Sequence, residues 1–588
     1  MTKDTPPGGL KAVLTLARAR RWPLAVACLL AAAGSLLAVL PFLVAVREAT
    51  GPTLSGAAFL AACLVLPPVA QGLSTGLAHA AAFDTLYRIR RDLADRLPRM
   101  PLGYFTARQT GALKRTLHED VEVLELFLSH QLPDMTACLM SPLLVLGLMA
   151  AVDWRYALAA LGIVPVALLV QKRMMQGHGT RMGDYFSRIG AINGATVEYT
   201  QGLPTLRGVG PGSPVETTLL ARIEDFRGFA ADWYRLWGPS WAAYTVVAGA
   251  WLLFIAPLAL WLTATGSSPP TEAAFALLAA TGLGPPLLRL TVYGEITLRV
   301  VQAERKISAI HTAPVLPEPR QPAALPQRKD LTFDAVSFSA NGTLILDRVS
   351  LTLPAGRLTA IVGPSGGGKS TLLRLAARFS DPDSGQIRLG GTDLRDLPST
   401  DLARCIGLVS QDTFLFDDTV EANLRLALSA GGHPTEGPEA DAALHRAVSL
   451  ARCEDVITAL PDGYATRLGR GGHRLSGGQR QRLSLARTLL GQPPVLLLDE
   501  VSASVDPVHE ALLQQAIAGL PGERTIAVVS HRLDSTCHAD HLVFVDRGRV
   551  IAEGPHPHLL ATCPAYARLW SLQQSNLGWD LRSSGKHT

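Results

Sequence analysis

A glycine-rich segment past the middle of the chain combines residue types that bind phosphate. The segment GPSGGGKSTLL, residues 363–373, follows the apolar run LTAIV. Its glycines allow backbone N–H groups to close on phosphate oxygens, and the helix expected after it offers its positive end. Lys369 is expected to reach the terminal phosphates of a nucleotide, and the Ser370 hydroxyl is expected to bind Mg²⁺. The predicted phosphate contacts are Gly363, Pro364, Ser365, Gly366, Gly367, Gly368, Lys369, Ser370 and Thr371.

A second segment, VLLLDE at residues 495–500, has the pattern of a buried strand that ends in two carboxylates. Asp499 is expected to hold Mg²⁺, and Glu500 is expected to activate the water molecule that attacks the terminal phosphate. Strands that end in Asp-Glu also arise by chance in large proteins. At this distance after a phosphate loop, the pair predicts nucleotide hydrolysis and not nucleotide binding alone.

A third segment, LSGGQRQR at residues 475–482, offers another site for an anion. Ser476, Gly477 and Gly478 stand at the expected start of a helix, followed by Gln479. Backbone N–H groups in such a turn bind phosphate oxygens. One nucleotide does not need two phosphate sites from one chain. The segment therefore predicts a dimer in which it closes on the nucleotide held by the partner.

Six long apolar stretches dominate the first half of the chain. They occupy residues 22–46, 57–83, 135–152, 156–171, 239–265 and 273–288. A helix needs about 20 apolar residues to cross a hydrocarbon core about 30 Å thick. The fourth and sixth stretches are slightly short by that rule, and the alternative is a set of buried helices in a large soluble protein. Six such runs favour a domain that spans a lipid bilayer.

The distribution of basic residues predicts the orientation of these spans. YRIRRDLADRLPRM follows the second stretch and KRMM follows the fourth, whereas the other links are nearly balanced in charge. Positive loops stay in the cytoplasm, so both termini and the second half of the chain are expected there. The net charge of +5 lies largely in these loops, which indicates contact with lipid and not with nucleic acid. The seven scattered cysteines fit neither a zinc site nor a disulfide framework.

The two basic connections are long, and a structureless loop of that length is unusual in a compact domain. We expect the membrane helices to extend beyond the bilayer and to meet at turns. Pro98, Pro101 and Gly103 mark the first predicted turn, and Gly202 and Pro204 mark the second.

A proline-rich linker at residues 312–327 then divides the chain. After it, strand-like and helical runs alternate, as in an α/β domain with a largely parallel sheet. The predicted boundaries are 1–311 for the membrane domain, 312–330 for the linker, 331–575 for the nucleotide-binding domain and 576–588 for a tail.

LSGGQ between the phosphate loop and VLLLDE resembles the ATP-binding cassette (ABC) transporters. Six spans ahead of such a cassette resemble the exporter-type half-transporters of that family. The resemblance implies an all-α, six-helix transmembrane domain followed by an α/β P-loop ATPase cassette, with ATP and Mg²⁺ as ligands. It also implies a second half-transporter, either an identical or a different chain, and a multi-pass protein of the bacterial cytoplasmic (inner) membrane.

The same resemblance implies roles for further residues. Gln411 in VSQDTFLF becomes the glutamine that contacts Mg²⁺ or water, and His531 in VVSHRL the residue that contacts the terminal phosphate. Asp506 ends the SVD segment that communicates across the dimer. Residues 104–111 and 199–206 become the two coupling helices that dock on the cassettes.

Two positions depart from the family pattern. VSFSA places Ala340 where the family usually has an aromatic residue that stacks on adenine. Since such stacking contributes about 1–3 kcal/mol in other contexts, weaker or less base-selective nucleotide binding is expected. Arg470 in LGRGG stands where exporters commonly have an acidic residue, which puts the usual coupling scheme in doubt.

Polar residues in the membrane half give a first indication of the cargo. His130, Gln131 and Asp134 lead into the third span, where they either form a functional site or merely end a helix at the interface. GLGPPLLRL interrupts the sixth span and adds Arg289; the break either forms a binding site or is a packing kink. A cavity with Arg289 and His130 suits an anionic or chelate-type small molecule.

Phrases such as YFTARQTGALKRTLHEDVEVLELFLSHQLPD and VEYTQGLPTLRG are similar to the exporter-fold subfamily that imports iron-loaded siderophores. The first expectation is therefore ATP-driven siderophore uptake. The alternative is export of a drug, peptide or lipid-like amphipathic substrate. A third hypothesis, an ATP-driven membrane regulator that moves nothing, is disfavoured by the six spans and two coupling turns.

Overall fold

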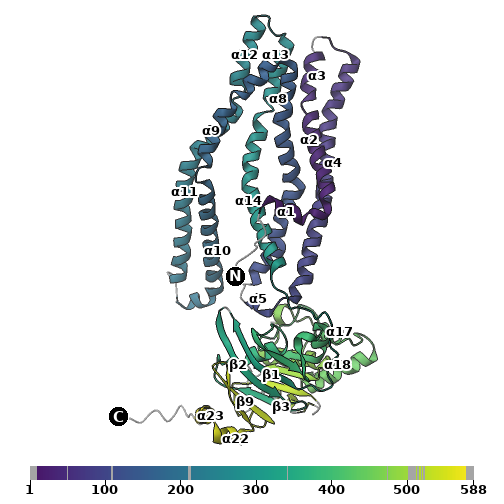
Figure 1. Ribbon diagram of the computed structural model, residues 1–588, viewed down its shortest axis with the longest axis vertical. Coiled ribbons are helices and arrows are strands. Elements are labelled where there is room, and N and C mark those ends of the chain that lie inside the picture. Colours follow the sequence, from purple (N-terminus) through teal and green to yellow (C-terminus); the bar gives the residue numbers. More distant parts are fainter. Residues whose placement is uncertain are drawn as a thin grey trace, which may run out of the picture. The chain divides into compact units, whose positions relative to one another are not determined.

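The structure is a computed structural model of the whole chain, and Figure 1 shows its elements. It describes residues 9–48, 51–106, 110–209, 213–340, 342–472, 474–500, 512, 515–517, 519–520, 524–534 and 536–577. The chain forms two compact units. Unit 1 contains Met1–Arg96 and Gly111–Thr312, and unit 2 contains Leu97–Thr110 and Ala313–Thr588. A short segment from the membrane half is therefore part of the same compact unit as the nucleotide-binding elements.

Unit 1 is built from long helices. Among the described residues, five helical segments are long and apolar enough to cross a membrane, namely Arg18–Glu48, Leu54–Arg99, Leu113–Gly208, Pro214–Ala264 and Pro270–Thr312. The third segment contains two of the predicted apolar stretches. They are separated at Asp153, where the backbone leaves helical geometry, with φ −154° and ψ 115°. Figure 1 shows the chain returning along the bundle through α9 (Val164–Met175), which follows α8 (Leu132–Leu161). The five segments thus provide the six predicted passes.

The helices of unit 1 follow one another with short breaks. They are α1 (Leu10–Leu16), α2 (Arg21–Leu37), α3 (Leu40–Glu48), α4 (Leu54–Arg96), α6 (Thr110–Arg115), α7 (Val121–Leu126), α8 (Leu132–Leu161), α9 (Val164–Met175), α10 (His178–Val209), α11 (Pro214–Gly249), α12 (Leu252–Ala264), α13 (Pro270–Ala280) and α14 (Gly284–Thr312). Two π-helical turns, η3 (Thr116–Asp120) and η4 (Phe127–Gln131), flank α7. Such turns re-aim side chains and are frequent at functional sites.

The prediction of the second cytoplasmic turn at Gly202 and Pro204 is wrong. Helix α10 continues through both residues to Val209, so residues 199–206 form no separate coupling helix. A proline inside a helix removes one hydrogen bond but does not always end the helix. A stronger sequence signal for the end of a helix is Gly-Pro-Gly-Ser at residues 210–213, of which the structure describes Ser213. Ser213 caps α11 by accepting a hydrogen bond from the N–H of Glu216 at 3.2 Å.

The break before α14 has a packing explanation. A Cβ atom at Gly284 would lie 2.4 Å from the carbonyl oxygen of Ala248 on α11, so only glycine permits this approach. Of the two readings of GLGPPLLRL, the structure favours the packing kink.

The described residues of unit 2 form two sheets. The first is antiparallel, with the order β2 (Thr343–Leu353), β1 (Leu331–Ala340), β4 (Ser384–Leu389) and β5 (Thr392–Asp393). The second has the order β10 (Arg549–Gly554), β9 (His541–Asp546), β3 (Leu358–Val362), β8 (Thr525–Val529), β7 (Val495–Asp499) and β6 (Ile406–Val409). Strands β9, β3, β8, β7 and β6 run parallel, while β10 is antiparallel to β9. The predicted α/β domain with a largely parallel sheet is confirmed.

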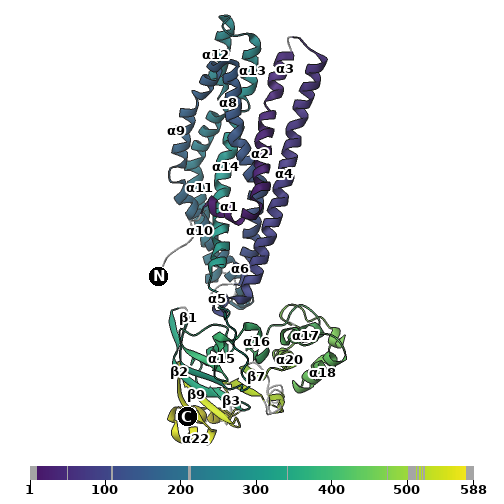
Figure 2. The ribbon, with the colours of Figure 1, turned by 45° about the vertical axis from the view of Figure 1, so that its right-hand side comes forward.

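Helices surround these sheets. They are α5 (Leu102–Thr106), α15 (Lys369–Ala376), α16 (Ser399–Cys405), α17 (Val420–Gly431), α18 (Pro438–Leu450), α19 (Glu454–Thr458), α20 (Gly477–Leu490), α22 (His556–Thr562) and α23 (Pro564–Leu577). Figure 2 shows α17, α18 and α20 as a helical group beside the sheets. Strand β7 is fully buried, with 0% exposure from Val495 to Leu498. A buried parallel strand of this kind holds the residues at its end in fixed positions.

Candidate functional site

The predicted phosphate loop lies between β3 and α15. Its glycines adopt left-handed or extended positive backbone angles, with φ of 147° at Gly363, 79° at Gly366 and 94° at Gly368. A Cβ atom at Gly363 would lie 2.0 Å from the carbonyl oxygen of Val545 in β9. Glycine is therefore required at this position for both the backbone angle and the close approach of β9. Ser365 and Gly367 lie in the same loop, and Thr371 lies in the first turn of α15.

Lys369 opens α15 and places its ammonium group over the loop. Its Nζ donates hydrogen bonds to the carbonyl oxygen of Gly363 at 2.9 Å and to that of Pro364 at 2.7 Å. The residue is 4% exposed, and this burial lowers the pKa of the ammonium group, while Glu500 and Asp499 act in the opposite direction. A buried cation above a loop of glycines suits the binding of phosphate.

Asp499 ends β7 beside the phosphate loop. Its Oδ1 accepts a hydrogen bond of 2.7 Å from the hydroxyl of Ser370. Asp499 is 1% exposed, and burial raises the pKa of its carboxyl group, although the Ser370 hydrogen bond opposes the rise. A buried carboxylate next to a hydroxyl is the kind of oxygen donor set that Mg²⁺ prefers. A cation there would offset the desolvation of Asp499, so the residues present fit the predicted metal.

Two other predicted residues, Gln411 and His531, contact the carboxylate of Glu500. The Nε2 of Gln411 donates a hydrogen bond of 2.7 Å to Oε2 of Glu500. The Nε2 of His531 contacts the other carboxylate oxygen, Oε1. Glu500 has a φ of 48°, which is uncommon for a residue other than glycine, and its N–H donates to the carbonyl oxygen of Val529 at 3.1 Å. Backbone strain of this kind clusters at functional sites.

Sheet topology explains why these residues converge. Strands β3, β8, β7 and β6 are consecutive neighbours in the sheet and run parallel. Gly363 follows β3, His531 follows β8, Glu500 follows β7 and Gln411 follows β6. The carboxyl ends of parallel strands share one edge of the sheet, which is where such sheets bind ligands.

The LSGGQ segment forms a rigid start to α20. The Ser476 hydroxyl accepts a hydrogen bond from the N–H of Gln479 at 3.3 Å, and Gln479 Oε1 accepts one from the N–H of Ser476 at 2.9 Å. This is a capping box, and Gly477 and Gly478 form the first turn behind it. In the part of the chain that the structure describes, no hydrogen bond joins residues 476–479 to the phosphate loop. Asp506 and the side chain of Arg470 lie outside the described residues.

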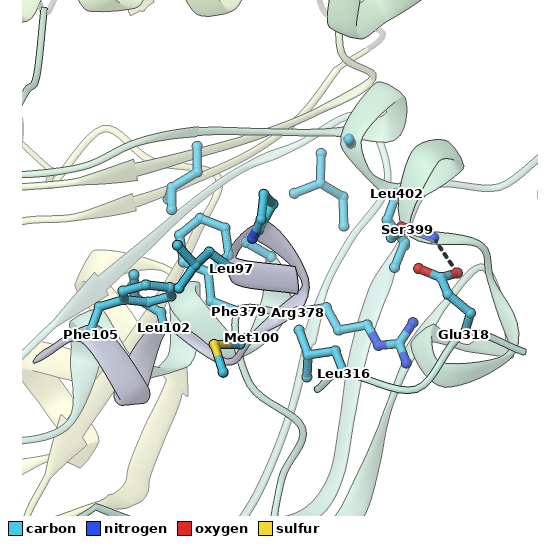
Figure 3. Close-up of a pocket in the computed structure, with 15 residues that line it drawn as sticks. Leu97, Met100, Leu102, Phe105, Leu316, Glu318, Arg378, Phe379, Ser399 and Leu402 are labelled. Carbon is cyan, nitrogen blue, oxygen red and sulfur yellow. Dashed lines mark hydrogen bonds between the residues drawn. The ribbon is translucent and has the colours of Figure 1, made fainter. Parts of the chain in front are cut away.

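The residues of the first predicted turn, 97–106, form a docking segment against the nucleotide-binding elements of unit 2. The N–H of Leu102 donates to the carbonyl oxygen of Phe379 at 2.8 Å, and the N–H of Leu316 donates to that of Arg99 at 2.8 Å. Figure 3 shows the cavity of about 610 Å³ beneath this segment. Its lining includes Leu97, Met100, Leu102 and Phe105 from the segment and Phe379 and Leu402 from the cassette side. The contact is therefore largely apolar, with main-chain hydrogen bonds at its rim.

Arg378 lines this cavity and is held in place by polar contacts. Its guanidinium donates to the carbonyl oxygens of Pro317 at 2.7 Å and Leu397 at 3.2 Å, and it pairs with Asp381 at 3.1 Å. Nearby, the N–H of Ser399 donates to a carboxylate oxygen of Glu318 at 3.2 Å and lowers the pKa of that carboxyl group. The linker residues 317 and 318 are thus tied to the cassette beside the docking segment (Figure 3).

In unit 1, polar side chains from different spans meet around Asp134. Its carboxylate accepts a hydrogen bond of 3.4 Å from Gln71 on α4 and one of 3.0 Å from the hydroxyl of Tyr293 on α14. The rings of His130 and His79 meet edge to face at 4.6 Å. These contacts join three helices, so Asp134 and His130 do more than end a helix.

Two further groups extend this polar cluster. Gln131 is 3% exposed, and its Oε1 has no hydrogen-bond partner among the described residues. Arg289 on α14 is exposed and lies near Tyr293 and Cys138. Sequence reasoning found His130, Gln131, Asp134 and Arg289 but missed Gln71, His79 and Tyr293. The available signal was their polarity: Gln71 and His79 lie inside the apolar stretch 57–83.

Ala340 ends β1 and pairs with Thr343 at the start of β2. The expectation of weaker or less base-selective nucleotide binding at this position stays a prediction.

Comparison with known proteins identifies both halves of the chain. Residues 46–265 match the family model of the ABC transporter transmembrane region, and residues 346–503 match that of the ABC transporter. The mycobactin import ATP-binding/permease protein IrtA of Mycobacterium tuberculosis is 35% identical over 511 residues, which cover 84% of this chain and 57% of IrtA. The chain thus spans a little more than half the length of that relative.

Other relatives are of similar length to this chain. The mycobactin import protein IrtB of Mycolicibacterium thermoresistibile is 31% identical over 518 residues, 86% of each chain. A permease of Staphylococcus aureus, whose name proposes multidrug export, is 30% identical over 522 residues, which cover 88% of this chain and 89% of the relative.

The structure of a bacterial Atm1-family ABC exporter with ATP bound shows the same fold, with a TM-score of 0.78 and 24% identity over 95% of this chain and 100% of that chain. Family models match both halves, and relatives at 30% identity or more match across most of their length. The chain therefore belongs to the ABC transporters, as a half-transporter with one exporter-type transmembrane domain and one ATP-binding cassette.

Proposed function

We propose that this half-transporter pairs with a second one and uses ATP hydrolysis to drive uptake of an iron-loaded siderophore across the bacterial cytoplasmic membrane. The observation that carries the ATPase part is the convergence of Gln411 and His531 on Glu500, next to Asp499. The cargo part is supported by the relatives IrtA and IrtB, which are named for mycobactin import.

Each of these residues has its own role in the binding and hydrolysis of ATP. The N–H groups of the phosphate loop and the ammonium of Lys369 bind the phosphates of ATP, and Ser370 and Asp499 hold Mg²⁺. When bound, Mg²⁺ neutralises charge that develops on the phosphate oxygens. Glu500 accepts a proton from the attacking water, while Gln411 and His531 hold its two carboxylate oxygens in place.

The dimer follows from the separate position of the LSGGQ segment. Its helix start, fixed by Ser476 and Gln479, presents backbone N–H groups that suit a phosphate anion. In the proposed dimer, this segment closes on the ATP held by the partner's phosphate loop. The partner is a second copy of this chain or a different half-transporter.

The docking segment connects the two activities. A change in the cassette around Phe379 moves the segment through its main-chain hydrogen bond to Leu102 and the apolar contacts beside it. The segment continues into the long helix α4 on one side, so displacement there passes to a helix that carries Gln71 and His79. We propose that this is the route by which hydrolysis opens and closes the transport path.

The direction of transport is the first thing to measure. The protein, with any partner, is placed in sealed vesicles that receive ATP on the cassette side and radiolabelled ferric siderophore on the opposite side. Movement of label toward the cassette side in the wild type, and none with Glu500→Gln, is the expected result. ATPase activity that depends on Glu500 without such movement would contradict uptake and favour the alternative, export of an amphipathic substrate, to which the Staphylococcus aureus relative's name and the exporter-type fold point.

Arg289 supports an anionic cargo. It carries a charge inside a membrane-spanning helix, and no ion pair joins it to a described side chain. The carboxylate of Asp134 is already engaged by Gln71 and Tyr293. Because an uncompensated charge in a membrane is costly, Arg289 fits a site that receives an anion.

We expect Arg289→Gln to raise the concentration of ferric siderophore that half-maximally stimulates the ATPase by about tenfold or more, since loss of one partner of a close charge pair costs at least about 2 kcal/mol. Stimulation is measured relative to each variant's own unstimulated rate. Arg235→Gln is the matched control, because Arg235 is an exposed arginine on α11 that pairs only with Asp232 at 3.4 Å among the described residues. Equal half-saturation in both variants would remove Arg289 from the cargo site.

A further inference from the structure

The C-terminal helix α23 contacts the loop that carries His531. The Nε2 of Gln573 donates a hydrogen bond of 2.5 Å to the carbonyl oxygen of His531. The N–H of Leu533 donates one of 2.8 Å to the Oε1 of the same side chain. One amide group on α23 therefore holds two main-chain groups on either side of Arg532, which lie 42 and 40 residues earlier in the sequence.

The chemistry of these groups fixes the orientation of the amide. A main-chain carbonyl oxygen only accepts a hydrogen bond and a main-chain N–H only donates one, so Gln573 must place Nε2 toward His531 and Oε1 toward Leu533. Glutamine and asparagine alone offer a donor and an acceptor at this spacing, and glutamine has the longer reach. The two bonds match those of a strand pairing and hold this part of the loop in one conformation.

Helix α23 is a firm support for such a contact. Tyr566 is 0% exposed, its hydroxyl contacts Nδ1 of His556 at 2.7 Å, and its ring meets that of Phe544 at 5.9 Å. Tyr566 and Phe544 share a buried cluster with Leu533 and Leu559. Figure 1 shows α22 and α23 beside β9. The loop is thus anchored by its buried Leu533 and by the amide of Gln573, both on the same side.

The other end of the loop reaches the hydrolytic site. His531 lies between Ser530, which is 4% exposed, and Arg532, whose N–H donates to the Ser530 hydroxyl at 3.0 Å. From this position the His531 ring contacts Glu500. A shift of the His531 carbonyl would move the ring with it, because the two belong to one residue.

We propose that Gln573 is a positioning residue for hydrolysis, which acts through His531 and touches neither ATP nor water. The C-terminal helix then takes part in setting the geometry at Glu500. This inference rests on the proposed function, since it needs His531 to act in hydrolysis. Gln573 would thus affect the rate of hydrolysis although it lies outside the three sequence segments that bind the nucleotide.

The test compares Gln573→Met with Gln574→Met in the full-length transporter. Methionine keeps the length of the side chain but removes both hydrogen bonds. Gln574 is the neighbouring, exposed glutamine on the same helix, and its side chain has no hydrogen bond to another described residue, so it controls for the loss of an amide from α23. We expect Gln573→Met to lower kcat for ATP hydrolysis roughly ten- to hundredfold, as small displacements in active sites do. KM for ATP and the apparent melting temperature should stay near wild type, and Gln574→Met should resemble wild type in all three.

The double variant separates positioning from general stability. If Gln573 acts through His531, Gln573→Met with His531→Ala should be no slower than His531→Ala alone, because residues that act as a unit are not additive. Gln573→Glu provides a second variant of the same shape. It keeps the acceptor for Leu533 but sets a carboxylate oxygen against the His531 carbonyl, so it should be slow as well.

Two results would overturn the inference: wild-type kcat in Gln573→Met, or a further loss in the double variant accompanied by a lower melting temperature. Either of these leaves the proposed ATPase intact if Glu500→Gln still abolishes hydrolysis in the same preparations. A Glu500→Gln rate within a few-fold of wild type would instead contradict the role that the proposed function gives to Glu500.

Discussion

Glu500→Gln is expected to slow ATP hydrolysis by about 10²–10⁴-fold, the range in which a positioned general base contributes to proton transfer. The amide has nearly the shape of the carboxylate, so it can still accept a hydrogen bond from Gln411 Nε2, which lies 2.7 Å from Oε2 in the native site. It cannot accept a proton from water. Phosphate release in a single turnover measures the effect, and binding of a fluorescent ATP analogue shows whether the nucleotide site is intact.

The backbone of Glu500 makes this substitution informative. The backbone strain at its φ of 48° is the same in the native protein and in the variant, because neither glutamate nor glutamine has the conformational freedom of glycine. Its N–H bond to the Val529 carbonyl oxygen does not involve the side chain. Glu439→Gln, an exposed glutamate at the start of α18, is the matched control and should hydrolyse ATP at the wild-type rate. A Glu500→Gln rate within a few-fold of wild type would mean that another group activates the water.

The sequence was most informative for the catalytic residues, which come directly after the ends of strands. Gln411, Glu500 and His531 each come directly after an apolar run, and parallel strands bring such positions to one edge of a sheet. What sequence could not supply was the strand order. Only the neighbouring positions of β3, β8, β7 and β6 place the residues within contact distance.

The membrane half was less predictable for a physical reason. Apolar stretches indicate that a helix crosses the bilayer, but they do not indicate which faces of two helices meet. Asp134 and Tyr293 are 159 residues apart and meet only because α8 and α14 pack together. The same holds for Gln573 and His531, whose contact joins a polar helix residue to a main-chain carbonyl and leaves no pattern in the sequence.

Gly363→Ala is expected to weaken ATP binding about a hundredfold or more. At φ 147° an L-residue is strained, and the added methyl carbon would lie 2.0 Å from the carbonyl oxygen of Val545, closer than any non-bonded contact allows. Strand β9 is buried and hydrogen-bonded in the sheet, so the loop must move and not the strand. A displaced loop also displaces Lys369, whose ammonium bonds to the Gly363 carbonyl oxygen at 2.9 Å. The dissociation constant of ATP, measured by equilibrium binding to the purified transporter, tests this expectation.

Gly366→Ala separates the backbone effect from the clash, because Gly366 also has a positive φ, 79°, but has no atom within 4 Å of the position of an added Cβ. The cost is then only that of a left-handed residue, about 1–2 kcal/mol, and the dissociation constant should rise by roughly tenfold. If the two variants bind ATP equally well, the close approach of β9 does not shape the phosphate site, and the loop must be free to reposition when nucleotide binds. A much larger loss in Gly363→Ala would show that β9 acts as the wall against which the loop is held, so that the sheet itself sets the position of the phosphates relative to Asp499 and Glu500.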